Sequence, residues 1–186
     1  MSATRIPMKT DGALVGAISW WTRRAYGDVM EPALVLAHNR KVLMTALRFQ
    51  RAVEKWDALD DKLKHLATLT AAATIGCSWC LDFGYWVSHS KGVDPAKLEA
   101  ITHWRTADVY SPVERLVIEY AEAMSVTPPA VTDELMARLR EHLSDAAVVE
   151  LTAVIALENE YSRTNAALGV TSQGFQDRCE LRPVHG

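Results

Sequence analysis

Apolar residues recur at helical spacing along almost the whole chain, and no stretch alternates convincingly between apolar and polar at every second position. Helices are therefore expected over most of the sequence. The expected segments are residues 13–26, 28–37, 39–53, 60–76, 77–92, 111–124, 132–142 and 144–169. The pattern predicts an all-α fold, a helical bundle in a single domain that spans residues 1–186.

The boundaries of these segments carry recognisable start and stop signals. Ser111-Pro112-Val113-Glu114 is a capping box with proline at the first helical position, and it opens the segment 111–124. Pro128 and Pro129 separate that segment from the next one. Residues 170–186 mix turn-forming and polar residues. This tail is expected to wrap the surface of the domain.

Composition and charge exclude several classes of protein. The chain has 186 residues with 49% apolar and 23% charged residues, which is ordinary for a globular protein. Its 20 Lys and Arg against 23 Asp and Glu give a net charge of −3, so no basic excess is available to bind nucleic acid. The apolar stretch 13–21 is too short to span a bilayer and has no signal-peptide cleavage site. A cytoplasmic protein without a membrane partner is expected.

Two of the three cysteines form a Cys-x-x-Cys motif, Cys77 and Cys80, at the expected start of a helix. Unpaired backbone N–H groups and the helix dipole favour a thiolate at such a position, and a thiolate attacks peroxides and disulfides. Two other interpretations are open. Buried cysteines often act as small apolar residues, and zinc needs four ligands where only Cys179 and scattered histidines remain. Redox chemistry without metal or cofactor is the favoured hypothesis.

Several segments together resemble the carboxymuconolactone decarboxylase family, in its alkylhydroperoxidase D-like branch that keeps a Cys-x-x-Cys. The resemblance rests on residues 63–67, 76–82, 111–124, 143–145 and 165–170. It extends from about residue 59 to about residue 170, and its core motif lies at about 59–105. The resemblance implies an all-α fold, assembly into homo-oligomers (often trimers or hexamers), and reduction of hydroperoxides by the cysteine pair.

In the peroxidase branch a proton relay serves the cysteines, and the resemblance implies where its members would lie. A glutamate twelve residues before the first cysteine corresponds to His65. A histidine just before the second cysteine corresponds to Trp79, and one four residues after it corresponds to Gly84. At all three positions this chain has a different residue type from the family relay, whereas both cysteines, Cys77 and Cys80, are present. Family decarboxylases that act on lactone acids lack this cysteine pair, so decarboxylation is not the expected reaction.

Three other ionisable residues are candidates for acid–base work. His65 is able to shuttle a proton near neutral pH, or is a half-exposed helix histidine. Asp82 is an accessory candidate, although it points about 200° away from Cys80 around a helix. Glu158 lies among apolar residues and is expected to face inward. A structural ion pair of Glu158 with Arg163 or a histidine is favoured over a role as a base.

The sequence therefore predicts a thiol-dependent oxidoreductase. Reduced Cys80 would attack a hydroperoxide, Cys77 would resolve the product to a disulfide, and His65 would carry the proton. Both cysteines lie in the first turn of the helix, so the sequence leaves open which of them attacks first. A small thiol or a redox protein would then reduce the disulfide. The alternative is a non-enzymatic or substrate-orphan helical oligomer of the same fold, in which the cysteines are structural or redox-sensing.

Overall fold

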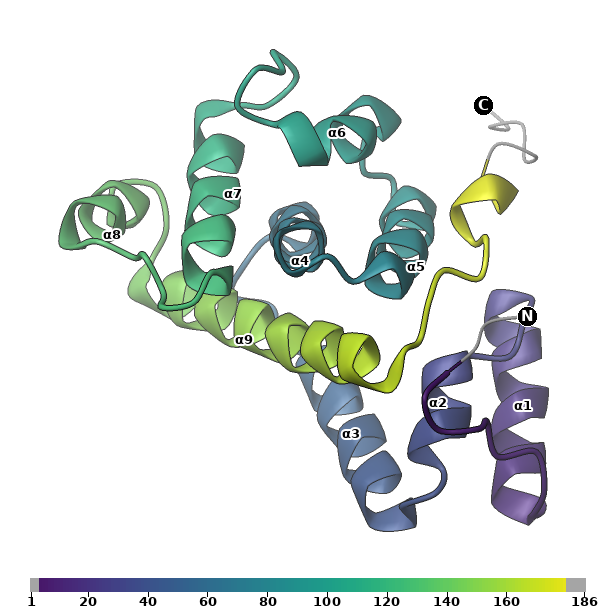
Figure 1. Ribbon diagram of the computed structural model, residues 1–186. Coiled ribbons are helices and arrows are strands. Elements are labelled where there is room, and N and C mark those ends of the chain that lie inside the picture. The colour runs from purple at the N-terminus through teal and green to yellow at the C-terminus, as the bar shows by residue number, and fades with distance from the viewer. Residues whose placement is uncertain (1–3, 180–186) are drawn as a thin grey trace. The chain divides into compact units, whose positions relative to one another are not determined.

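The computed structural model describes residues 4–179, and this part of the chain contains helices and no β-strand (Figure 1). The predicted all-α class is confirmed. The α-helices are α1 (Ala13–Tyr26), α2 (Glu31–Leu36), α3 (Arg40–Val53), α4 (Asp61–Ile75), α5 (Ser78–Ser90), α6 (Pro95–Glu99), α7 (Pro112–Ser125), α8 (Asp133–Arg140) and α9 (Asp145–Leu168), and the 3-10 helices are η1 (Ala100–His103) and η2 (Gln176–Arg178). None of these helices is long and apolar enough to cross a membrane.

The helix boundaries follow the capping signals closely. The capping box forms as predicted, because the Ser111 hydroxyl accepts from the Glu114 N–H and the Glu114 carboxylate accepts from the Ser111 N–H at 2.8 Å. Helices α6 and η1 were not predicted. Asp94 caps α6 by accepting from the Ala96 N–H at 2.9 Å, and Pro95 occupies the first position. A helix of five residues is too short to show a period of apolar positions.

The described residues fold into two compact units. The first comprises residues 4–55 and 165–171, and the second comprises residues 56–164 and 172–179. In the first unit, α1, α2 and α3 pack around Val15, Ala37 and Leu43. The Arg5 guanidinium donates to the carbonyl oxygens of Ala166 and Ala167 at 2.5 and 2.7 Å. This cation adds hydrogen bonds to carbonyl groups in the last turn of α9, where the helical hydrogen-bond pattern ends.

In the second unit α4 is the central helix, and Figure 1 shows it end-on between α5 and α7. Its alanines Ala67 and Ala71 belong to one apolar core with α7, α8 and α9. Leu66 and Leu69 belong to a second core with α5, α6, η1 and α7. Because α4 is apolar on both sides, it holds the two cores together and fixes the position of the turn that follows it.

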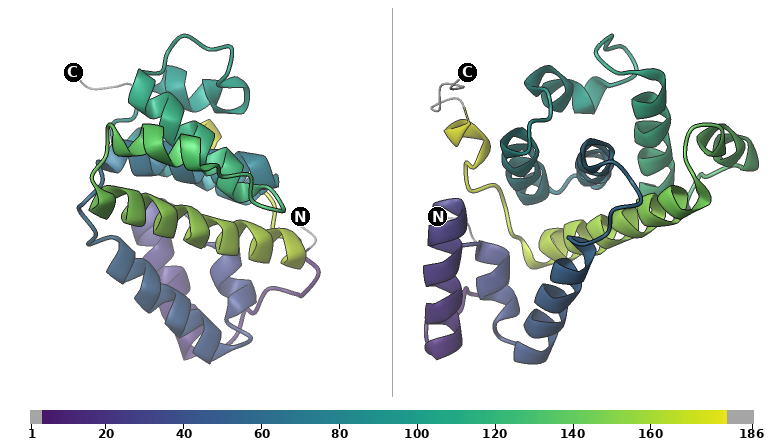
Figure 2. Two further views of the ribbon diagram at one scale, coloured as in Figure 1. Left: turned by 90° about the vertical axis from the view of Figure 1, so that its left-hand side faces the viewer. Right: turned by 180° about the vertical axis from the view of Figure 1, so that it is seen from behind.

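A buried ion pair joins the beginning of α4 to α9. Lys64 Nζ lies 2.6 Å from Glu150 Oε1, and the other carboxylate oxygen accepts from the Ala58 N–H at 2.8 Å. Burial lowers the pKa of Lys64, but hydrogen bonds to Glu150 and Asp61 outweigh it and the pKa is raised. The left view of Figure 2 shows α4 and α9 one above the other. The pair therefore sets the register between these two helices.

Candidate redox site

Cys77 and Cys80 form a disulfide at the turn between α4 and α5, with their Cα atoms 5.3 Å apart. Gly76 ends α4 with φ of 82°, a left-handed conformation that glycine adopts without strain. Cys77 is the N-cap of α5, and its sulfur accepts from the Cys80 N–H at 3.2 Å. Both side chains are buried, with 2% and 6% of their surface exposed. The same N–H and the helix dipole would stabilise a thiolate at Cys77 after reduction.

The position of the family's second relay histidine is occupied by Gly84, where α4 and α5 approach closely. A Cβ atom on Gly84 would lie 3.1 Å from Leu69 Cδ1. Leu69 is itself almost fully buried in the core between the two helices. A histidine at residue 84 would therefore need Leu69 to shift. The close packing of α4 against α5 therefore favours glycine at residue 84.

His65 lies at the other end of the α4–α5 pair from the disulfide. Ten residues of α4 follow His65 before the turn to Cys77, which corresponds to roughly 15 Å along the helix axis. The charges that act on it are Asp61, Lys64 and Lys91, the last of which follows the C-terminal end of α5. Burial is the main reason that the pKa of His65 is lowered. The structure does not bring His65 together with the cysteines, so its proposed role as their proton carrier has no direct route.

Trp79, at the position of the first relay histidine, is part of an aromatic cluster. Its ring stacks on the Phe83 ring with the two ring centroids 4.9 Å apart, and the Phe83 ring stacks on the Trp86 ring with centroids 5.9 Å apart. Phe175 is fully buried and meets all three rings. The Trp79 indole N–H donates to Gln173 Oε1 at 2.7 Å. Trp79 is therefore a packing residue and offers no group that could exchange a proton at neutral pH.

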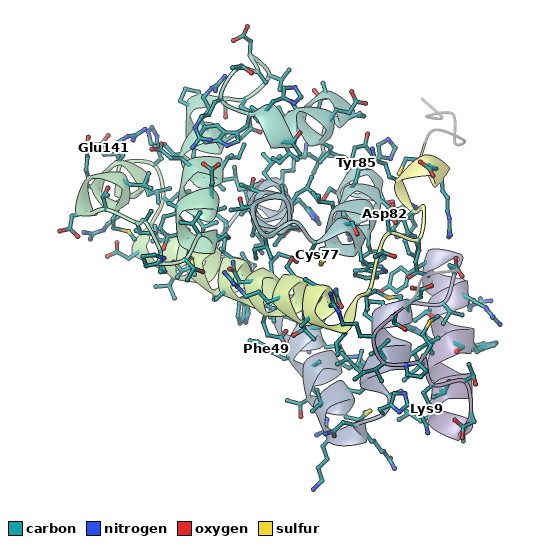
Figure 3. All side chains as sticks on the ribbon, viewed as in Figure 1. Lys9, Phe49, Cys77, Asp82, Tyr85 and Glu141 are labelled. Atoms are coloured by element: carbon teal, nitrogen blue, oxygen red, sulfur yellow. A yellow bond between two sulfur atoms is a disulfide. The ribbon has the colours of Figure 1, made fainter. Side chains whose placement is uncertain are left out.

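Asp82 anchors a segment from the end of the chain, which we call the C-terminal strap (residues 172–179). One carboxylate oxygen accepts from the Ser172 hydroxyl at 2.9 Å and from the Gln173 N–H at 2.8 Å. The other accepts from the Gln176 N–H at 2.7 Å. Asp82 is buried, with 5% of its surface exposed; Figure 3 labels it together with Cys77. Its carboxylate is fully engaged in holding the strap, so an accessory role in proton transfer is not supported.

The strap is most of the described part of the predicted surface tail, residues 170–179; residues 180–186 lie outside the described residues. It inserts Phe175 into the aromatic cluster, so it contributes to the core of the second unit. Cys179, at its end, is half-buried and packs against the core that contains Tyr85 and Leu98. Among residues 4–179 no group of three or more His, Cys, Asp or Glu side chains could hold a metal ion.

The Glu158 side chain on α9 is half-buried and its carboxyl group is shielded from solvent, which agrees with the inward orientation expected from the sequence. The predicted ion pair with Arg163 is wrong. The Arg163 guanidinium donates to the Ser125 carbonyl and the Thr127 hydroxyl, whereas Glu158 accepts from the Ser162 hydroxyl at 2.7 Å. With no cation beside it in the described part of the chain, burial raises the pKa of Glu158 to about 7. A carboxyl group with this pKa can both take up and release a proton at neutral pH.

The raised pKa of Glu158 predicts a pH-dependent stability. The folded protein binds the Glu158 proton more tightly than the unfolded chain does, because the pKa of Glu158 is about 7 when folded and 4.5 when unfolded. The stabilisation is therefore complete below about pH 4.5 and is lost as pH rises through about 7. Urea denaturation of the wild type and Glu158→Gln should show the wild type losing about 2 kcal/mol relative to the variant between pH 5 and pH 8. Parallel pH profiles of the two proteins would show that Glu158 titrates normally.

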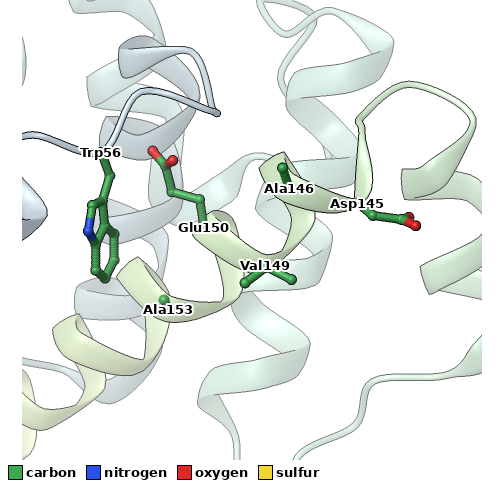
Figure 4. A pocket seen from close by; sticks show the side chains of 6 residues that line it. All are labelled: Trp56, Asp145, Ala146, Val149, Glu150 and Ala153. Carbon is green, nitrogen blue, oxygen red and sulfur yellow. The ribbon is translucent and has the colours of Figure 1, made fainter.

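A surface pocket of about 460 Å³ lies on the second unit near the start of α4. It is lined by Trp56, Asp145, Ala146, Val149, Glu150 and Ala153 (Figure 4). The walls are mostly apolar, and the one buried carboxylate in it is already paired with Lys64. Neither cysteine lines this pocket, so it is separate from the candidate redox site.

The chain belongs to the carboxymuconolactone decarboxylase family. The family model matches residues 42–123, which include α4, α5 and most of α7. The chain is also 35% identical over 158 residues to the uncharacterized protein YnjA of Escherichia coli, covering 84% of this chain and 87% of YnjA. The family resemblance inferred from the cysteine motif is thus confirmed.

Solved structures share the fold. The debrominase Bmp8, in complex with 2,3,4-tribromopyrrole, is 17% identical and superposes with a TM-score of 0.83 over 97% of this chain and 98% of Bmp8. A peroxidase-related protein with an alkylhydroperoxidase AhpD core, from Ralstonia eutropha, is also 17% identical. It superposes with a TM-score of 0.80 over 93% of this chain and 94% of that protein. At these identities the comparison establishes the alkylhydroperoxidase D-like fold.

Proposed function

We propose that the protein is a thiol-dependent oxidoreductase that reduces hydroperoxides through Cys77 and Cys80. The observation that carries this proposal is the disulfide itself, which joins the N-cap residue Cys77 to Cys80 in the first turn of α5. Such a pair can cycle between dithiol and disulfide without rearrangement of the backbone. Membership in a family with peroxidase-related members supports the same chemistry.

The proposed cycle has three balanced steps. The Cys80 thiolate attacks the terminal oxygen of a hydroperoxide, breaking the O–O bond and leaving Cys80 as a sulfenic acid, while the departing alkoxide takes up a proton and becomes an alcohol. The Cys77 thiolate then attacks the Cys80 sulfur, and the hydroxyl leaves as water with one proton. Two thiol groups of a small thiol or a redox protein finally reduce the disulfide and become a disulfide themselves.

The test is consumption of an organic hydroperoxide by the protein in the presence of dithiothreitol, with the Cys77→Ser/Cys80→Ser double variant as the control. Wild-type turnover well above the double variant is the expected result. Equal rates would refute peroxidase activity and leave the alternative, a helical oligomer with structural or redox-sensing cysteines. Light scattering on the same samples would test our further expectation of a homo-oligomer.

An aryl bromide is a second candidate substrate that the reduced cysteine pair could reduce. The debrominase Bmp8 superposes on 97% of this chain, and its complex contains a brominated pyrrole. A dithiol can in principle reduce a carbon–bromine bond, because two thiols supply two electrons and two protons, yielding the debrominated ring, bromide and a disulfide. Bromide release from an aryl bromide by the reduced protein, and none by the double variant, would assign this activity.

A further inference from the structure

The proposed reduction needs a group that moves protons, and the three family relay positions do not supply one beside the cysteines. Trp79 and Gly84 carry no ionisable group, and His65 lies toward the far end of α5. Asp82 is held by three hydrogen bonds from the C-terminal strap. Another carboxyl group of the second unit, Glu158, is shielded from solvent and has no ion-pair partner among the described residues. The position of this group relative to the disulfide follows from the packing of α9 on α4.

Glu158 continues the stripe of α9 that packs on α4. Leu151 and Ile155 lie in one core with Ala67 and Ala71 of α4. Glu158 follows Ile155 by three residues and lies on the same side of the helix, as does Ser162, which follows Ile155 by seven. Ser162 is fully buried. The apolar stripe therefore ends in the half-buried Glu158, whose carboxyl group accepts from the fully buried Ser162 hydroxyl.

This end of the stripe is the end nearest to the disulfide. Lys64 in the first turn of α4 pairs with Glu150 in the second turn of α9, and the shared core begins within a few residues of both. The two helices therefore proceed from this pair in the same general direction, as the left view of Figure 2 also shows. In residues 157–164, which belong to the second unit, α9 consequently approaches the α4–α5 turn, and Figure 3 shows the labelled Cys77 above α9 in that view.

We propose that Glu158 is the group that exchanges protons with the reduced Cys77–Cys80 pair. The inference rests on the redox function proposed above and names its proton carrier. As a carboxylate, Glu158 accepts the proton of the attacking Cys80 thiol; as an acid, it returns that proton to the alkoxide released from the hydroperoxide. Glu158 takes up one proton and releases one proton, so it is again a carboxylate at the end of the step.

The surroundings of Glu158 suit this exchange. Burial raises its pKa, the hydrogen bond from Ser162 lowers it, and the charge of Glu160 raises it. The nearby cation Arg163 is engaged with Ser125 and Thr127. Helix α4 packs on this face of α9 through Ala67 and Ala71, and its own ionisable side chains all lie in its first two turns, away from the disulfide. The groups at the start of α5 that titrate are the two cysteines after reduction. Proton gain and loss by Glu158 should therefore be visible in the reactivity of the thiols.

The test measures alkylation of the reduced protein by iodoacetamide between pH 5 and pH 9, which needs no hydroperoxide. The wild type should show two inflections, one from a thiol and one near pH 7 from Glu158. Glu158→Gln keeps the size of the side chain and should lose the inflection near pH 7. Glu160→Gln is the matched control on the same helix, and it should keep that inflection and move it to lower pH.

A third variant gives a shift in the opposite direction. Ser162→Ala removes the hydrogen bond that lowers the Glu158 pKa, so the inflection should move up by about half a pH unit. If the wild type consumes hydroperoxide, Glu158→Gln should also reduce kcat at pH 7 by about 100-fold. A wild-type profile with one inflection, or an unchanged second inflection in Glu158→Gln, would overturn the proposal. Absence of hydroperoxide turnover in the wild type would refute the proposed function, while alkylation would still decide the role of Glu158.

Discussion

Replacing either Cys77 or Cys80 by serine is expected to reduce hydroperoxide turnover by at least about 1,000-fold. Each cysteine has a separate task, because one forms the sulfenic acid and the other converts it to the disulfide that the reductant recognises. Serine keeps nearly the same volume at these two buried positions. Circular dichroism of both variants should therefore match the wild type, and the loss should be chemical. Steady-state assays with dithiothreitol and an organic hydroperoxide measure the effect.

The two variants should also differ from each other in a single turnover. Cys77→Ser is expected to form one sulfenic acid at Cys80 on addition of hydroperoxide, detectable by a dimedone adduct in mass spectrometry. Cys80→Ser is expected to form none. His65→Gln is the control, and its turnover should stay within about twofold of the wild type because the structure places His65 away from the pair. Turnover at a wild-type rate in either cysteine variant would contradict the two-cysteine cycle.

Asp82→Ala is expected to lower the free energy of unfolding by about 3 kcal/mol. The change removes the acceptor of three hydrogen bonds, two of them from the N–H groups of Gln173 and Gln176. Urea denaturation measures the loss. Trypsin cleavage after Arg178 should become faster than in the wild type, because that residue lies in the strap and its guanidinium packs over the Phe175 ring at 4.6 Å.

Asp108→Ala is the matched control for this change, since Asp108 is an exposed aspartate of the same unit. It should change the free energy of unfolding by less than about 0.5 kcal/mol. Asp82→Asn keeps an acceptor oxygen and should fall between the two. If Asp82→Ala unfolds at the wild-type urea concentration and is cleaved no faster, the carboxylate does not hold the strap.

Much of the fold could be predicted from the sequence because its signals are local. The helical spacing of apolar residues predicted the long helices. Ser111 and Glu114 predicted the start of α7, and Gly76 predicted the end of α4. The cysteine motif at the start of α5 was likewise visible, because a helix N-terminus is a local feature. The family was identified from the residues around this motif.

The arrangement around the cysteines could not be predicted, because it depends on residues far apart in the chain. The partners of Asp82 lie some ninety residues later, and no local pattern marks a buried acceptor of this kind. The contact of Gly84 with Leu69 depends on how closely α4 and α5 pack. For Glu158, the sequence correctly placed the side chain inside but assigned the wrong partner. Arg163 and Ser162 are both within reach on a helix, and only the packing against Ser125 and Thr127 decides between them.

The central claim is that Cys77 and Cys80 together deliver two electrons to a hydroperoxide. The most direct measurement is a single turnover without reductant, in which reduced protein is mixed with a limiting amount of organic hydroperoxide and the remaining thiols and the alcohol are counted. We expect two thiols to be lost for each alcohol formed, and a Cys77–Cys80 disulfide to appear in the peptide map. Loss of thiols without alcohol, or alcohol formed while both cysteines stay reduced, would contradict it.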